Sequence, residues 1–266
     1  TAVERTNVMR VPNAALRFTP TVATEAAKKS ITSGMVMGPP KIIKRSAATD
    51  ASTALARKAR FWDRIARKYA ADPIADLPGY EATLRRVQGL LTLEQAVLEI
   101  GCGTGSTALR LAPFTERLLA TDVSSEMIAI AREKLAARPV PQLSFAVADA
   151  DVPMAHPGKY DAVLAFNLLH LVTDLDHALA LATRALRPGG LLISKTACIS
   201  EMNPLIPYLA LPLMRAMGKA PHVLCFDAGA LQAAMVRQGL EIVAVERHGT
   251  KGKKDIRVFI VARKPG

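Results

Sequence analysis

Short apolar runs alternate with amphipathic stretches from residue 96 to the end of the chain. Apolar runs of about four to eight residues are typical of buried strands, and an apolar residue roughly every three to four positions is typical of helices. The pattern predicts strands at 96–100, 117–121, 143–147, 160–165, 190–196, 240–247 and 256–263, and helices at 105–112, 125–137, 174–186 and 228–238. It indicates a doubly wound α/β fold with helices on both faces of a sheet.

The last two predicted strands are joined by a short loop rich in lysine and glycine. Such a loop is too short for a helical crossover, so these strands must run antiparallel and close a mostly parallel sheet with a hairpin. Two more helices are expected before the first strand. One begins near Thr53, with Phe61, Ile65 and Tyr69 spaced four residues apart, and the other covers 80–93.

The positive charge of the chain is concentrated at its N-terminal end. Residues 1–68 hold 14 of the 35 Lys and Arg residues but only four of the 23 Asp and Glu residues, so the rest of the chain is close to neutral. Residues 1–55 lack periodicity, which predicts a basic, disordered arm followed by one domain at 56–266. Since the charge lies mainly in the arm, we expect no nucleic-acid partner.

The three cysteines, Cys102, Cys198 and Cys225, form no CxxC pair. Neither a zinc site nor a disulfide framework is therefore expected, and reduced thiols favour a cytoplasmic protein. No apolar run reaches the length of about 18 residues that a membrane span needs, so at most a peripheral membrane contact is expected. The sequence leaves the oligomeric state open.

A glycine-rich turn follows the strand at 96–100 and is the most specific signal in the chain. Its residues are Gly101, Cys102, Gly103, Thr104 and Gly105. An acid, Asp122, ends the next strand, and this arrangement is how α/β proteins bind a nucleoside cofactor. The glycines let the backbone approach the ligand, while the Asp122 carboxylate accepts hydrogen bonds from ribose hydroxyls.

Two neighbours of the turn distinguish between cofactors. Ser106 stands where the dinucleotide signature requires glycine. Glu99 lies two residues before the turn, where a carboxylate suits a cationic amino group and repels a pyrophosphate. The turn therefore favours S-adenosylmethionine over a dinucleotide.

Several stretches besides the turn carry a resemblance to one family. They are 61–69, 97–105, 121–124, 148–150, 160–163 and 186–190. Through them, residues from about 60 to 263 resemble a class I S-adenosylmethionine-dependent methyltransferase of the ubiquinone/menaquinone-biosynthesis type. The resemblance implies a Rossmann-like sheet of seven strands, and S-adenosylmethionine as the cofactor.

The same resemblance implies roles for single residues. Asp149 would bond the adenine amino group, Ala150 would present its backbone amide to the ring, and Val123 and Met127 would pack on the adenine. Near the methyl donor, the implied residues are Asn167, beside the sulfonium, and Tyr69 with Arg64, over the methionine end. A shorter resemblance, of residues 10–45 to a fragment of an efflux-pump periplasmic adaptor, carries no function here.

Methyl transfer from a sulfonium requires alignment and exclusion of water, and a base only if the acceptor loses a proton. Base candidates are His170, on the loop after the strand at 160–165, and His222, in an insertion at 198–226. The apolar, proline-punctuated part of that insertion, 204–217, is expected to be a lid over a small hydrophobic acceptor such as a quinone, phenol or lipid precursor. Asp161 is interpreted as structural.

Some acceptors are disfavoured because their motifs are missing. The chain has no Asn/Asp-Pro-Pro-aromatic motif after Asn167, no Pro-Cys nucleophile and no paired-glutamate loop, which disfavours nucleic-acid amino groups, cytosine C5 and arginine. Two alternatives to a small-molecule methyltransferase stay open. One is a nicotinamide-dependent oxidoreductase, and the other is a non-catalytic S-adenosylmethionine-binding module.

Overall fold

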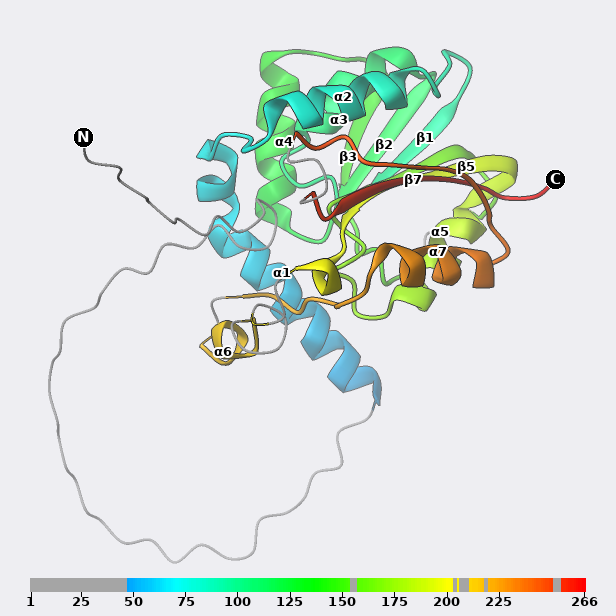
Figure 1. The fold of residues 1–266 in the computed structure, drawn as a ribbon. Helices are drawn as coiled ribbons and strands as arrows, with labels where there is room; N and C mark the ends of the chain where they lie inside the picture. Colours follow the sequence, from blue (N-terminus) through cyan, green and yellow to red (C-terminus); the bar gives the residue numbers. More distant parts are fainter. Residues whose placement is uncertain (1–46, 154–156, 203–204, 206–210, 218–219, 251–254) are drawn as a thin grey trace, which may run out of the picture.

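The computed structural model describes residues 47–153, 157–202, 205, 211–217, 220–250 and 255–266. Within them, seven strands form one sheet in the order β3-β2-β1-β4-β5-β7-β6 (Figure 1). The strands are β1 (Ala96–Ile100), β2 (Arg117–Asp122), β3 (Leu143–Val147), β4 (Tyr160–Phe166), β5 (Leu186–Ala197), β6 (Glu241–Glu246) and β7 (Arg257–Arg263). The helices are α1 (Ala47–Ala71), α2 (Leu77–Gln88), α3 (Ser106–Leu111), α4 (Ser125–Ala137), α5 (Leu175–Ala185), α6 (Leu211–Ala216) and α7 (Ala228–Arg237).

The sheet has the predicted mixture of strand directions. Strands β1 to β5 pair in parallel, whereas β7 is antiparallel to both of its neighbours, β5 and β6. Strand β7 thus lies between β5 and β6, which both precede it in the sequence. The predicted fold class, a mostly parallel sheet closed by an antiparallel hairpin, is confirmed.

Alternate residues of the strands contribute side chains to two hydrophobic cores, one on each face of the sheet. On one face, Val97 and Leu118 join a buried cluster with residues of α2, α3 and α4. On the other face, Leu98 and Val163 join a cluster with residues of α5 and α7. Figure 1 shows these helices above and below the sheet, as expected for a doubly wound fold.

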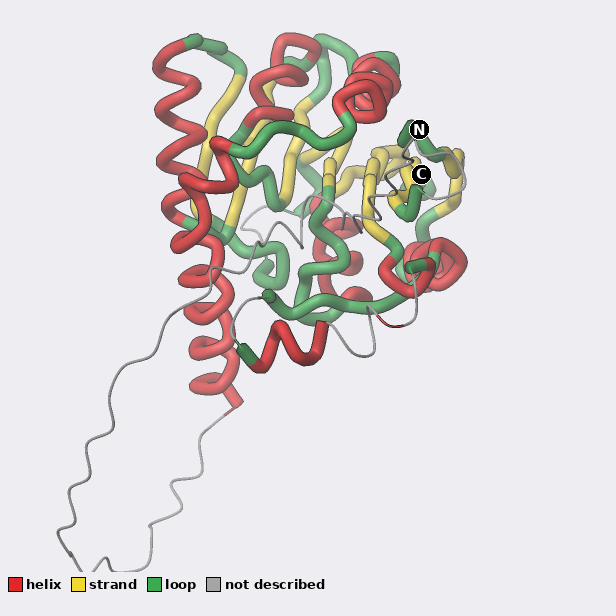
Figure 2. Tube along the Cα trace, turned by 60° about the vertical axis from the view of Figure 1, so that its left-hand side comes forward, coloured by secondary structure: helices red, strands yellow, loops and turns green. Residues whose placement is uncertain are grey.

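The long helix α1 runs along the edge of the domain beside α4 (Figure 2). Ala66 packs against Met127 and Ile130 of α4, with Trp62 and Tyr69 at the rim of this cluster. This contact places the side chains of α1 beside the end of the sheet where β1 and β2 stop.

One acid of α1 fixes the N-terminus of α4. The Asp63 carboxylate accepts hydrogen bonds from Ser124 Oγ at 2.6 Å and from the Glu126 backbone N–H at 3.1 Å.

Helix α1 begins at Ala47 rather than near Thr53, within the stretch predicted to be an arm. The rest of that arm, including the efflux-adaptor resemblance at 10–45, lies outside the described residues.

Two elements begin earlier in the structure than the sequence predicted. Helix α2 starts at Leu77 rather than at residue 80, because the buried Asp76 caps it by accepting a hydrogen bond from the Gly79 N–H at 3.1 Å. Strand β5 starts at Leu186, immediately after α5. Asp161 accepts a hydrogen bond from the Ala96 N–H at 2.8 Å, in keeping with its interpretation as structural.

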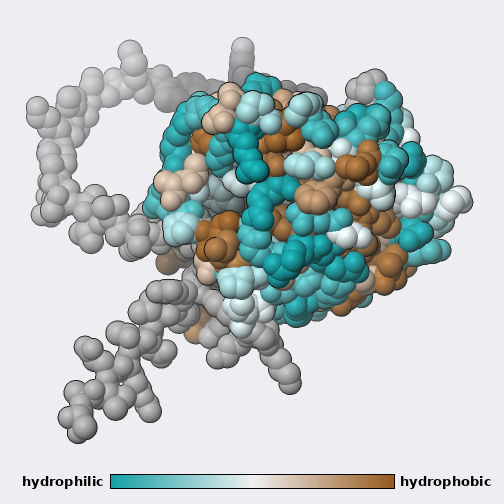
Figure 3. Space-filling model, turned by 90° about the horizontal axis from the view of Figure 1, so that it is seen from above, coloured by the Kyte–Doolittle hydropathy of each residue, from teal (hydrophilic) through white to brown (hydrophobic). Residues whose placement is uncertain are grey.

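The surface of the domain is mixed. On the face seen in Figure 3, hydrophilic residues run between separate hydrophobic patches. Among the described residues, no helix is both long and apolar enough to cross a membrane.

Candidate cofactor and acceptor cavities

The glycine turn between β1 and α3 adopts a backbone that side chains disfavour. Gly101, Gly103 and Gly105 have φ of 68°, 55° and 71°, in the left-handed region that glycine enters without strain. A Cβ at Gly101 would meet Leu168 Cδ1 at 2.5 Å, and one at Gly105 would meet Phe145 Cζ at 2.6 Å. At Gly103 the nearest atom would be 3.9 Å away, so this glycine leaves an open face.

Asp122 at the end of β2 ties the turn to the next loop. Its two carboxylate oxygens accept hydrogen bonds from the backbone N–H groups of Gly103 and Ser124, each at 2.9 Å. Burial raises the pKa of Asp122, although these two hydrogen bonds favour its charged form. The acid thus faces the position where the turn is most open.

Glu99 is the most perturbed acid of this region. It is 2% exposed, and its Oε2 atom has no hydrogen-bond partner within the described part of the chain. Burial, and secondarily the charge of Asp122, raises the pKa of Glu99 to about 8. An orphaned, protonated carboxyl in a cavity wall is suited to a cationic ligand, which would return it to its ionised form.

Asp149, in the loop after β3, is held by a lysine from α1. Lys58 Nζ lies 2.6 Å from Asp149 Oδ1 and 3.0 Å from Asp151 Oδ2. The Asp151 N–H also donates to Asp149 Oδ1, at 3.0 Å. Both hydrogen bonds that Asp149 accepts reach Oδ1, so its Oδ2 atom is not used by either of these donors. Sequence reasoning counted Lys58 only among the basic residues at the N-terminal end, because nothing local links it to Asp149.

These groups line a cavity of about 120 Å³ at the carboxyl ends of β1, β2 and β4. Of the predicted cofactor residues, this wall contains all but Gly105 and Arg64: Glu99, Gly101, Cys102, Gly103, Asp122, Val123, Met127, Asp149, Ala150, Asn167 and Tyr69. Arg64 is exposed, and its guanidinium lies over the ring of Phe61 instead. Gly105 lies beneath the turn, where it packs on Phe145. Lys58, Trp62 and Leu171 line the cavity without having been predicted.

The donor set of this cavity fits S-adenosylmethionine. Asp122 lines the cavity, where the remaining lone pairs of its carboxylate can accept hydrogen bonds from ribose hydroxyls, and Asp149 has one oxygen that can accept from an exocyclic amine. Glu99 offers a buried carboxyl for the ammonium group. The cofactor, when bound, supplies a methyl group that is already activated for displacement.

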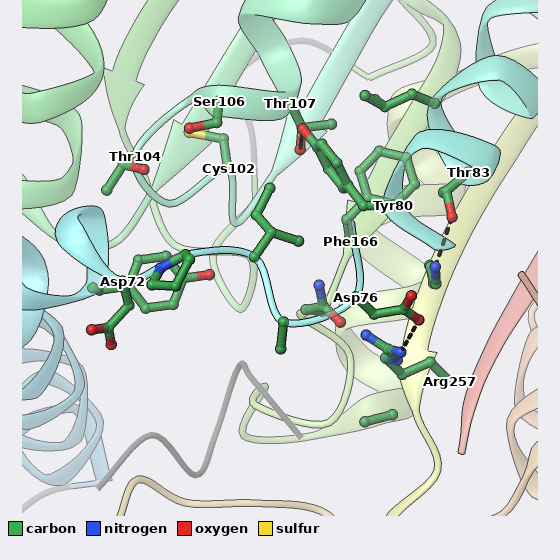
Figure 4. A pocket seen from close by; sticks show the side chains of 18 of the residues that line it. Asp72, Asp76, Tyr80, Thr83, Cys102, Thr104, Ser106, Thr107, Phe166 and Arg257 are labelled. Atoms are coloured by element: carbon green, nitrogen blue, oxygen red, sulfur yellow. Dashed lines mark hydrogen bonds and ion pairs between the residues drawn. The ribbon is translucent and has the colours of Figure 1, made fainter. Parts of the chain in front are cut away.

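A second cavity, of about 480 Å³, adjoins the first (Figure 4). Both cavities are lined by Tyr69, Cys102, Thr107, Phe166 and Asn167. Asn167 lies at this junction with a φ of 52°, the only positive φ of a non-glycine residue in the described chain. Its N–H donates to the Lys195 carbonyl at 2.7 Å, which fixes the strained residue at the mouth between the cavities.

The two histidines predicted as base candidates occupy different places. His170 lines the larger cavity and is fully buried, and among the described residues neither ring nitrogen has a hydrogen-bond partner. Burial lowers the pKa of His170 to about 4. His222 is exposed and lines neither cavity.

The predicted lid at 204–217 lies partly outside the described residues, which omit 203–204 and 206–210. Its described part includes α6 and exposes the apolar side chains of Leu205, Leu213 and Met217. None of these described residues lines either cavity.

The larger cavity has a polar end that the sequence did not predict. Lys195 of β5 donates to Thr83 Oγ1 at 2.7 Å and to the Gly79 carbonyl at 3.2 Å. Arg257 of β7 donates to Asp76 Oδ2 at 2.9 Å, as Figure 4 shows, and to Asp255 Oδ1 at 2.9 Å. The available signal for this site was a lysine in the second half of a strand, 190–196, whose first half is apolar.

The fold and the two adjoining cavities are those expected of an α/β protein with a nucleoside-cofactor site next to a second ligand site. Residues 97–190 match the family described as a methyltransferase domain. A crystal structure of an S-adenosylmethionine-dependent methyltransferase from Mesorhizobium loti is similar, with a TM-score of 0.58 at 21% identity, covering 70% of this chain and 97% of that one. Such an identity shows the fold alone.

Two curated relatives are similar to this chain over shorter stretches. The iterative polyketide synthase afoE of Emericella nidulans is 35% identical over 126 residues, which is 43% of this chain and 4% of the synthase. The biotin biosynthesis bifunctional protein BioCD of Bordetella avium is 32% identical over 179 residues, 65% of this chain and 37% of that protein. The chain therefore spans well under half the length of these relatives.

The predicted class is confirmed by these findings. Residues 97–190 carry a methyltransferase domain, and S-adenosylmethionine is the methyl donor predicted for it. The acceptor is not identified by any of these similarities.

Proposed function

We propose that this chain transfers a methyl group from S-adenosylmethionine to a small acceptor bound in the larger cavity. The observation that carries the proposal is the shared wall: the cavity lined by Glu99, Asp122 and Asp149 and the larger cavity have Tyr69, Phe166 and Asn167 in common. A methyl group held at that wall is within reach of an acceptor on the other side, and alignment alone supplies much of the rate enhancement.

The acceptor is a small molecule with an apolar part. The cavity of about 480 Å³ is within the usual size range of sites for small ligands, and Ile74, Leu84, Phe166 and Ile199 contribute apolar wall. A lid over this cavity, formed by 204–217, remains our prediction, since the described residues of that segment line neither cavity. A cytoplasmic location remains our prediction, based on the unpaired thiols of Cys102, Cys198 and Cys225.

The roles proposed for the site residues follow from their places. Asp122 binds the ribose hydroxyls, Asp149 binds the adenine amine, and Glu99 binds the ammonium group. Asn167 lies where the cofactor cavity meets the acceptor cavity. Water is excluded at the methyl position by Tyr69 and Phe166, which line both cavities.

Calorimetry with S-adenosylhomocysteine and with NADH on the full chain tests the cofactor side of the proposal. We expect saturable binding of S-adenosylhomocysteine and none of NADH, and the opposite result would favour the oxidoreductase alternative. Incubation with methyl-labelled S-adenosylmethionine and pools of phenols, quinols, acids and amines, read by mass spectrometry, then identifies the acceptor. Cofactor binding without label transfer to any pool would favour the non-catalytic module.

A further inference from the structure

Lys195 is a buried cation in the wall of the larger cavity. It is 6% exposed, and among the residues described it forms no ion pair, since its hydrogen bonds go to the neutral oxygens of Gly79 and Thr83. An ammonium group has three N–H donors, so one remains for another partner. Burying a lone charge is costly unless it is paired, which favours a ligand that supplies the partner.

A hydrogen-bonded chain joins this lysine to the surface. Lys195 Nζ lies 2.7 Å from Thr83 Oγ1, which lies 3.0 Å from His248 Nδ1. The Thr83 hydroxyl also lies 2.8 Å from the Gly79 carbonyl, so its hydrogen turns from Gly79 to His248 when it passes a proton. His248 Nε2 in turn lies 2.9 Å from Glu246 Oε2, whose side chain is 31% exposed. The series passes from the cavity through a hydroxyl and an imidazole to a partly exposed carboxylate that is also paired with Arg86. Hydroxyl, imidazole and carboxylate groups can each relay a proton.

We propose that the acceptor is a weak acid, with an ionisable O–H or an activated C–H, and that Lys195 takes its proton while Thr83 and His248 pass that proton to the surface. This inference rests on the proposed methyl transfer and names the acceptor class and the base for it. The alternative base in the same cavity, His170, has no hydrogen-bonded partner among the described residues through which a proton could leave.

The proton balance of the step is complete. The Lys195 amine takes the acceptor proton and becomes an ammonium, and the acceptor anion displaces the methyl group from the sulfonium. The acceptor–carbon bond forms as the carbon–sulfur bond breaks, and its electron pair stays on the sulfur. Lys195 then loses one proton through Thr83 and His248 to solvent, so each turnover releases one proton.

The charged groups around Lys195 are consistent with this role. Burial first, and then the charge of Arg257, lowers the pKa of Lys195 to about 8, while Asp255 and Asp76 oppose this shift. Both acids are themselves paired with Arg257. An amine with a pKa close to neutrality is an efficient proton acceptor, whereas His170, with its pKa near 4, is a weak base.

The inference is tested without turnover by 4-nitrophenol, whose anion absorbs visible light. The full chain, saturated with S-adenosylhomocysteine, is titrated with this probe below the pH at which the free probe ionises. We expect the bound probe to be the anion in the native protein, because it pairs with the Lys195 ammonium. A bound probe that stays neutral in the native protein, or no saturable binding, would overturn the inference without any variant being needed.

Variants then assign the effect to Lys195. Lys195→Met should weaken binding of the anion roughly tenfold or more, as expected for loss of a charged hydrogen bond. It should leave binding of 4-nitroanisole, which has no proton to lose, unchanged. The exposed Lys159→Met is the matched control and should bind both probes as the native protein does. Equal anion binding by Lys195→Met, with S-adenosylhomocysteine affinity intact, would refute the assignment.

Turnover separates the base from a simple cation. Lys195→Arg keeps a positive charge that cannot take up a proton, so it should bind an acceptor that is already ionised in solution but should not ionise a neutral one. Methyl transfer should therefore fall roughly tenfold or more below the pH at which the free acceptor ionises, and recover above that pH. Thr83→Val should slow turnover and flatten its pH profile. Full turnover by Lys195→Arg below that pH would remove the base role, and an unchanged profile in Thr83→Val would remove the exit route.

Failure of this inference is distinguishable from failure of the proposed function. If methyl transfer occurs but the bound probe is neutral, only the role of Lys195 is wrong. If the probe binds as the anion but no acceptor of any class is methylated, the site is real and the methyltransferase proposal fails.

Discussion

Glu99 should couple cofactor binding to the release of a proton. With a pKa of about 8, roughly nine in ten molecules carry a proton on Glu99 at pH 7. A cationic ammonium placed beside the carboxyl favours its charged form and should return its pKa toward the ordinary value of 4.5. Binding at pH 7 should therefore release about 0.9 proton per cofactor molecule.

The same proton sets the pH dependence of affinity. Ionising Glu99 at pH 7 costs about 1.4 kcal/mol, one pH unit below its pKa, which weakens binding roughly tenfold compared with a protein already ionised. Affinity should rise about tenfold per unit from pH 6 and level off as pH passes through about 8. Asp122 contributes less to this release, because two backbone N–H groups already favour its charged form.

Calorimetry in buffers of different ionisation enthalpy measures the release directly. The native protein should show an apparent binding enthalpy that depends on the buffer at pH 7, with S-adenosylmethionine and with S-adenosylhomocysteine, since both carry the ammonium group. Glu99→Gln, which has nearly the same shape, should bind more weakly and show no buffer dependence. Equal enthalpies in all buffers for the native protein, or unchanged release by Glu99→Gln, would refute the reasoning.

Further predictions concern the cofactor acids, the arm and acid stability. Asp122→Asn should weaken cofactor binding by about 1–3 kcal/mol in calorimetry, and unchanged affinity would exclude Asp122 from the site. Lys58→Met should weaken it by about 1 kcal/mol, because Lys58 orients Asp149, whereas tighter binding would mean that Lys58 competes with the adenine. Deleting residues 1–46 should leave the affinity for S-adenosylhomocysteine intact, and a loss would make the arm part of the fold. Because the pKa of His170 is about 4 in the folded state and 6.5 when unfolded, stability should be complete above pH 6.5. It should fall by about 1.4 kcal/mol per unit toward pH 4, and thermal melts should show a shallower fall in His170→Leu.

The sequence predicted the parts of the site that lie close together along the chain. The strand before Gly101, the turn itself and Asp122 at the end of the next strand obey local rules of periodicity and turn chemistry. The direction of the last two strands also followed, since a short loop forces β6 and β7 to run antiparallel, whereas the place of β7 between β5 and β6 was not predicted.

The groups that sequence reasoning missed come from pairings between distant elements. Lys58 reaches Asp149 across 91 residues, and Lys195 reaches Thr83 across 112. No periodicity in either segment specifies these contacts, which depend on how α1 and α2 pack at the end of the sheet. His222 was singled out by residue type alone, and type does not determine whether a side chain faces a cavity.

The place of β7 between β5 and β6 has a consequence for biosynthesis. As the chain leaves the ribosome, β6 emerges before β7, the strand that lies between β5 and β6 in the folded sheet. Until β7 has been made, the backbone groups of β5 and β6 that will pair with it have no partner strand. Arg257, at the start of β7, emerges well after the glycine turn and can reach Asp76 and Asp255 only then. The cofactor turn can thus form on the nascent chain before β7 has been made, whereas the polar end of the acceptor cavity is completed only once β7 is in place.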